Sequence, residues 1–249
     1  MTPRTDRIPA DGVPDDEPAA LQEHHHADVS GGWLRAAVFG AMDGLVTNTA
    51  LVAGVGGGGA APRTIVLTGV AGLVAGAISM ALGEYTSVKT QNEQLDLEVA
   101  KERRELERHP EEELAELVAM LRVRGVEDRL AREVAVQLSR DPEVALRLHV
   151  VAEVGLSPED EPSPRTAAVS SFLTFSLGAV LPLLPYLFGL SLLWVALLCG
   201  GLGLVAAGAL SSRFTPRPWW YAGLRQLLFG ALAAGATYAI GAAIGVTAS

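Results

Sequence analysis

The chain has 249 residues, of which 49% are hydrophobic and 19% charged, and its formal net charge is −9 at pH 7. This composition excludes a disordered chain, and the single cysteine excludes a secreted module held together by internal disulfides. The negative net charge argues against a nucleic-acid partner, because phosphate binding requires a basic surface.

The acidic residues are confined to two parts of the chain. Seven lie within residues 1–28 and nineteen within residues 89–161, whereas only Asp43 and Glu84 lie between these parts and none follows Glu161. A soluble domain could not cover such long uncharged stretches with polar surface. We therefore expect a membrane protein with a charged insert.

Five apolar stretches reach the length of about 20 residues that a helix needs to cross the hydrocarbon of a bilayer. A polar tail precedes the first stretch, so we do not expect it to be a cleavable signal peptide. Pro182 and Pro185 are expected to end or kink the third. In chain order the predicted spans are Trp33–Gly56, Thr64–Tyr85, Thr166–Phe188, Ser191–Leu210 and Ala222–Val246.

The basic residues near the span ends predict the orientation, because cytosolic ends carry more Lys and Arg. If the N-terminus is in the cytosol, Arg63 is the one basic residue near a span end that lies outside the cell. The cytosolic side then receives Arg35, Lys89, Arg165, Arg213, Arg217 and Arg225. We expect a multi-pass protein of the cell membrane, with the N-terminus and insert in the cytosol and the C-terminus outside.

The predicted fold class is all-α: a polytopic membrane protein with five transmembrane helices and a cytosolic helical domain. Its expected parts are a disordered cytosolic tail (1–30), transmembrane helices 1 and 2 (31–88), the helical insert (89–161) and transmembrane helices 3 to 5 (162–249).

Within the insert, apolar residues recur at helical spacing, for example at Leu114, Leu117 and Leu121. We expect the first insert helix to continue the second span without a break. A proline-rich linker, Leu156–Pro164, is expected to lead into the third span. The predicted helices cover about 86–108, 111–124, 127–139 and 142–154.

The acids of the insert recur at helical spacing as well. Glu98, Glu102 and Glu105 share one face of a helix. Glu113 and Glu116 are three residues apart, and His149 and Glu153 are four apart, so the members of each pair also lie on one helix face. Like charges at this spacing destabilise a helix unless something neutralises them, and a divalent cation would do so. The alternative is a solvated acidic face whose charges are balanced locally by Arg103, Arg104 and Arg108.

Polar residues also occur inside two predicted spans. Asp43, followed by Thr47 and Asn48, lies within the first span, and Met80 and Glu84 lie four residues apart in the second. An acid inside a membrane is a functional-site hypothesis by default, because burying it costs roughly 3 kcal/mol. Simple packing for Met80 and an interfacial position for Glu84 are the alternatives.

Two segments carry a family resemblance. Residues 39–48 read FGAMDGLVTN, and residues 72–87 read GLVAGAISMALGEYTS, ahead of the Glu-rich insert. Together they resemble the vacuolar iron transporter family, from about Ser30 to the C-terminus. The long insert makes the chain similar to a bacterial member of the branch with a cytosolic metal-binding domain.

The resemblance implies a homodimer whose first spans line a shared pathway, and which moves ferrous iron, and often manganese, out of the cytosol in exchange for protons. Zinc is a possible surrogate ion, and no cofactor is implied. His149 replaces a methionine of the family pattern, which adds pH sensitivity. The expected metal ligands are Glu102, Glu105, Glu113, Glu116, His149 and Glu153, and the expected pathway residues are Asp43, Asn48, Met80 and Glu84.

The leading functional hypothesis is therefore a divalent metal–proton antiporter. One alternative is a membrane-anchored metal sensor or scaffold whose helical insert binds a protein partner, and another is a calcium or magnesium carrier. An enzyme is not expected, because no catalytic triad, phosphate-binding loop or HExxH motif is present. The His24–His26 run is interpreted as a solvated polar stretch.

Overall fold

The computed structural model describes residues 32–155, 161–214 and 216–248. The predicted tail with its His24–His26 run, and residues 156–160 of the predicted linker, lie outside the described residues.

In the part of the chain that the structure describes, five helical segments are long and apolar enough to cross a membrane, which confirms the predicted fold class. Helix α1 is central, since it packs against α2, α6, α8 and α9. The five segments are α1 (Gly32–Gly57), the first part of α2 (Pro62–Arg108), α6 continued through α7 (Pro164–Leu187), α8 (Leu193–Ser211) with the short turn that follows it, and α9 (Trp219–Ala248).

The third span is interrupted, as its prolines predict. Helix α6 (Pro164–Val180) gives way to a 3-10 turn, η2 (Leu181–Leu183), before the short α7 (Leu184–Leu187). Pro182 has no backbone N–H to donate, so α6 ends before it, and Pro185 lies in the first turn of α7, where no donor is needed.

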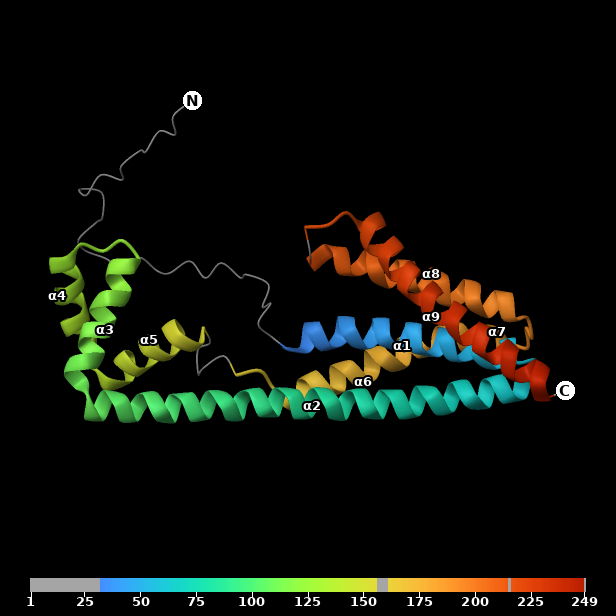
Figure 1. The fold of residues 1–249 in the computed structure, drawn as a ribbon, viewed down its shortest axis with the longest axis horizontal. Helices are drawn as coiled ribbons and strands as arrows, with labels where there is room; N and C mark the ends of the chain where they lie inside the picture. The colour runs from blue at the N-terminus through green and yellow to red at the C-terminus, as the bar shows by residue number, and fades with distance from the viewer. Residues whose placement is uncertain (1–31, 156–160, 215, 249) are drawn as a thin grey trace, which may run out of the picture.

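Helix α2 joins the two halves of the molecule (Figure 1). Its 47 residues extend without a break for about 70 Å, from the membrane part into the insert. At its far end lie α3 (Pro110–Val123), α4 (Asp128–Leu138) and α5 (Pro142–Val154). These bounds agree with the expected insert helices within two residues.

The end of the membrane part that faces the insert contains the start of α1, the start of α6 and the connection between α8 and α9 (Figure 1). The turn between α1 and α2 lies at the opposite end. Arg35, Arg213 and Arg217 therefore share the insert-side end, and Arg63 lies at the other.

Candidate metal centre and membrane pathway

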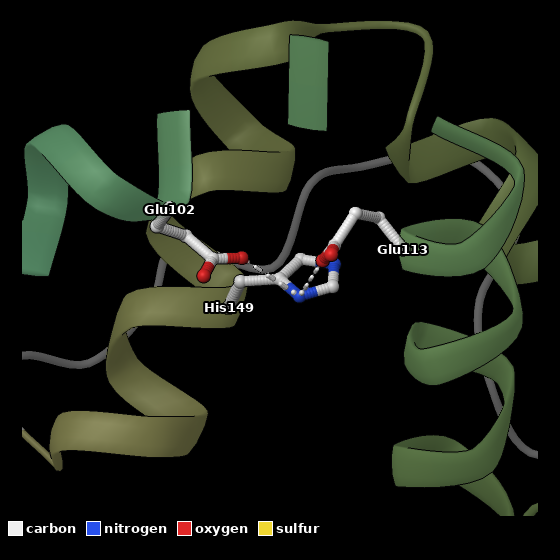
Figure 2. Close-up of side chains that lie close together, drawn as sticks. All are labelled: Glu102, Glu113 and His149. Atoms are coloured by element: carbon white, nitrogen blue, oxygen red, sulfur yellow. Dashed lines mark ion pairs between the residues drawn. The ribbon is translucent and has the colours of Figure 1, made fainter. Parts of the chain in front are cut away.

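Three side chains from three helices converge inside the insert (Figure 2). Glu102 comes from α2, Glu113 from α3 and His149 from α5. The Nδ1 atom of His149 lies 3.2 Å from Oε1 of Glu102 and 3.3 Å from Oε2 of Glu113. One ligand atom of each residue lies within 4.8 Å of the other two. We call Glu102, Glu113 and His149 the insert cluster.

An apolar contact between α2 and α5 positions this cluster. Leu95 of α2 is buried against Leu146 and Val150 of α5, and these two residues flank His149 in the chain. The side chain of Asp141 caps the start of α5 by accepting hydrogen bonds from the backbone N–H groups of residues 143 and 144. The His149 imidazole is therefore held on a helix whose position is set by this apolar contact and whose first turn is capped by Asp141.

An ion pair also joins these two helices. The guanidinium of Arg103 in α2 donates two hydrogen bonds, of 2.5 and 3.1 Å, to the carboxylate of Glu143 in α5. Both side chains are exposed, so this pair contributes less to stability than the apolar contact does. Its bidentate geometry fixes how α5 lies on α2.

The insert cluster is buried, and its two short contacts are ion pairs only when His149 is protonated. The side chains of His149, Glu102 and Glu113 are 1%, 9% and 13% exposed. Among the described residues, none of their three facing atoms has a hydrogen-bond partner. Buried polar groups without partners are costly, so the geometry favours a ligand that satisfies all three.

Burial and neighbouring charges raise the pKa of two carboxyl groups of the cluster. Burial, followed by the charges of Glu153, Glu113 and Glu116, raises the pKa of Glu102 to about 7. Burial also raises the pKa of Glu113, against the opposing effect of His149. Negative charge is therefore concentrated where it is poorly solvated, and a bound cation would relieve it.

The donor set fits a first-row divalent cation. Carboxylates with an imidazole suit iron, manganese and zinc better than they suit calcium or magnesium. Ligands about 2.1 Å from an ion place opposite donor atoms about 4.2 Å apart. Adjacent donor atoms lie about 3.0–3.4 Å apart, and the distances of 3.2 and 3.3 Å from His149 Nδ1 to the two carboxylate oxygens fall in this range.

The other three expected ligands lie outside the insert cluster. Oε2 of Glu105 is 3.8 Å from Nε2 of His109 at the corner between α2 and α3. Glu116 and Glu153 are exposed, although their charges act on Glu102. The structure thus brings together three of the six expected residues, with two further acids close enough to add negative charge.

In the membrane part, Asp43 is half-buried on one side of α1, and its Oδ1 accepts a hydrogen bond of 3.2 Å from the Thr47 hydroxyl. Helical spacing puts Arg35, Phe39, Asp43 and Thr47 along the same side, and all except Asp43 are exposed. We call these four residues the open stripe of α1, since the other helices of the chain leave it uncovered along much of its length.

The remaining expected pathway residues lie in two other places. The buried amide of Asn48 donates to the backbone carbonyl of Ala179, just before the break in the third span, and half-buried Met80 packs near the same residue. Glu84 is buried and accepts a hydrogen bond of 2.8 Å from Arg35. Asp43 is the expected pathway residue that belongs to the open stripe.

Sequence reasoning missed the partners of two charged residues. It did not connect Arg35 with Glu84, and it considered for Arg103 only pairing with nearby acids, as an alternative to metal binding, whereas Arg103 binds Glu143 of α5. For Arg35 the available signal was that Arg35 and Glu84 lie at the same predicted end of the first two spans.

Comparison with known proteins decides the family. The model described as the VIT family matches residues 34–242, which include the insert and nearly all of the membrane part. The chain belongs to the VIT family. Its members are vacuolar iron transporters rather than enzymes, which confirms the predicted family and the predicted absence of catalysis.

Individual VIT family relatives cover most of the chain. Vacuolar iron transporter 1 of Oryza sativa subsp. japonica is 33% identical over 236 residues, or 92% of this chain and 93% of the relative. Vacuolar iron transporter of Acanthamoeba castellanii is 36% identical over 205 residues, which are 77% of this chain and 74% of the relative. Vacuolar iron transporter homolog 1 of Oryza sativa subsp. japonica is 35% identical over 213 residues, which are 84% of this chain and 72% of the relative.

Proposed function

We propose that this protein transports ferrous iron, and also manganese, out of a bacterial cytosol in exchange for protons. The relatives are named iron transporters, and the carboxylate–imidazole set of the insert cluster suits both ions. The N-terminus and insert then lie in the cytosol and the C-terminus lies outside the cell membrane.

The observation that carries this proposal is the continuity of α2. One unbroken helix holds Glu102 of the insert cluster and, about 27 Å closer to the membrane end, Glu84. Metal gathered by the insert is thereby held at a fixed distance from the insert-side end of the membrane pathway. In this account Glu102, Glu113 and His149 bind the ion, and Glu105, Glu116 and Glu153 attract it and supply further ligands as the site closes.

The second part of the proposal is a homodimer. An acid in the bilayer costs roughly 3 kcal/mol if it faces lipid, and the open stripe leaves Asp43 incompletely covered. Two copies that face each other through this stripe would place both Asp43 side chains beside one polar pathway. Met80 and Asn48, at the contact with α6, and Glu84, at the insert-side end, would complete the pathway.

Proton exchange follows from the same side chains. Carboxylates bind a divalent cation when deprotonated and release it when protonated. An acidic compartment beyond the membrane would therefore favour release there and proton entry in the opposite direction.

The test is transport by the purified full-length protein in liposomes that contain one metal-sensitive and one pH-sensitive dye. The proposal predicts entry of Fe2+ and Mn2+ with opposite proton movement, both faster when the interior is acidic. Metal binding without any flux above protein-free liposomes would contradict it and would favour a membrane-anchored sensor. Glu133→Gln, an exposed α4 change outside the insert cluster, is the control and should transport normally.

A further inference from the structure

The connection between α8 and α9 carries a concentration of positive charge. Arg213 follows the end of α8, Arg217 lies in the connection and Arg225 lies in the second turn of α9, and all three are exposed. We call these three residues the basic corner. It lies at the end of the membrane part that faces the insert (Figure 1).

No carboxylate of the described chain pairs with the basic corner. No acidic residue occurs anywhere from Pro162 to Ser249. Within the described residues, no ion pair includes these arginines. The Arg217 guanidinium lies instead 5.9 Å from the centre of the Tyr221 ring. These charges are available to an external anion.

Aromatic residues place this corner at the depth of lipid headgroups. Trp219, Trp220 and Tyr221 follow one another at the start of α9 and are 63%, 56% and 44% exposed. Exposed aromatic rings at the end of a span favour the interface between hydrocarbon and water. The guanidinium groups next to them therefore lie where phosphates of the bilayer lie.

An apolar groove of about 290 Å3 adjoins the basic corner. It lies between the start of α1 and the end of α8, and its lining includes Trp33, Val38, Ala207 and Phe214. Arg213 immediately precedes Phe214 in the chain. The positive charge of Arg213 is thus placed beside an apolar groove, which is the surface that a lipid acyl chain prefers.

We propose that the basic corner and this groove bind an anionic phospholipid of the insert-side leaflet. The phosphate contacts the arginines, and one acyl chain lies in the groove. A zwitterionic lipid offers the same phosphate together with a cation that these charges repel. Each basic residue near an anionic surface favours binding by about fivefold, so the preference over a zwitterionic lipid is measurable.

The tryptophans allow a direct test on the full-length protein in bilayers. Trp33, Trp219 and Trp220 lie at this end, and Trp194 begins α8 at the other. In a Trp194→Phe background, brominated phosphatidylglycerol should quench the fluorescence with an apparent affinity at least about fivefold higher than brominated phosphatidylcholine does. Equal quenching by the two lipids would overturn the proposal.

Variants separate the charge from the groove. Replacing Arg213, Arg217 and Arg225 together by glutamine should bring the ratio of apparent affinities for phosphatidylglycerol and phosphatidylcholine close to one. Lysine at the same three positions should retain most of the preference for phosphatidylglycerol. Arg63→Gln, at the opposite end, should leave it unchanged. A preference that survives the triple glutamine change would refute the role of the corner.

A further variant tests the groove while keeping all three arginines. Ala207→Leu adds bulk to the lining and should lower the apparent affinity for brominated phosphatidylglycerol at least about twofold, with the helical circular dichroism unchanged. An unaltered affinity would overturn the placement of the acyl chain.

Discussion

The imidazole of His149 in α5 faces the carboxylate of Glu102 in α2, with Nδ1 lying 3.2 Å from Oε1 and both side chains buried. Neither atom has a hydrogen-bond partner among the described residues, and Glu113 completes the group from a third helix. Three separate helices therefore meet at polar atoms that a proton on His149 or a shared cation would satisfy. The first two predictions test this arrangement.

Removing the imidazole should weaken metal binding by the full-length protein. His149→Ala deletes one of three donor atoms and should lower the affinity for Mn2+ at least about tenfold in calorimetry, since even changes around a metal site cost that much. Glu133→Gln should bind as the unchanged protein does. Unaltered affinity and stoichiometry in His149→Ala would show that the insert cluster is not the site.

The metal-free insert should lose stability as the pH rises. Folding raises the pKa of Glu102 from 4.5 to about 7, so its contribution is fully present below pH 4.5 and is lost as the pH rises toward 7. The loss is on the order of 2 kcal/mol. Hydrogen exchange of α3 and α5 amides, corrected for intrinsic rates, should show lower protection at pH 7.5 than at pH 5.5.

A paired variant distinguishes this effect from a general response to pH. Glu102→Gln removes the titrating group, so it should reduce the pH dependence of amide protection in α3 and α5. It should also increase the protection of the metal-free insert at pH 7.5 and weaken metal binding. Metal affinity of the unchanged protein should rise over the same pH interval. A pH dependence that is identical in Glu102→Gln would exclude Glu102 as its source.

The fold was predictable from sequence because its main determinants are local. The length and hydropathy of each span, the prolines at 182 and 185, and the helical periodicity of the insert all act within one segment of the chain. The continuity of α2 followed in the same way, since no Gly–Pro break separates its membrane and insert parts.

The composition of the site was only partly predictable. Spacing identifies Glu102, Glu113 and His149 together with four other acids, and the family resemblance reduces these to three. Neither fixes how α2, α3 and α5 rotate against one another, which decides which side chains converge. The pairs Arg35–Glu84 and Arg103–Glu143 join different helices and depend on the same missing information.

The ion pair between α1 and α2 gives a third prediction. Arg35→Gln leaves the buried carboxylate of Glu84 without its partner and should cost about 1–3 kcal/mol. Glu84→Gln should cost less, because Arg35 is largely exposed, and the double variant should recover part of the loss. Thermal unfolding of all four proteins in one detergent measures the coupling, and strictly additive losses would argue that the pair is unimportant.

Close packing of α1 on α6 gives a fourth prediction. A side chain at Gly44 would meet the backbone carbonyl of Phe175, so Gly44→Ala should separate the helices and cost about 1–3 kcal/mol. Gly83→Ala is the matched control in α2, where nothing lies within 4 Å, and it should be neutral or slightly stabilising. Equal unfolding temperatures for the two variants would contradict the described packing.

The central claim is that a divalent cation crosses the membrane beside Asp43, and Fe2+ flux into dye-loaded liposomes with an acidic interior measures it directly. Asp43→Asn should reduce the initial rate at least about tenfold, while metal binding by the insert cluster stays intact and Glu93→Gln, an exposed change in α2, transports normally. An Asp43→Asn protein that moves Fe2+ at the unchanged rate would contradict the account.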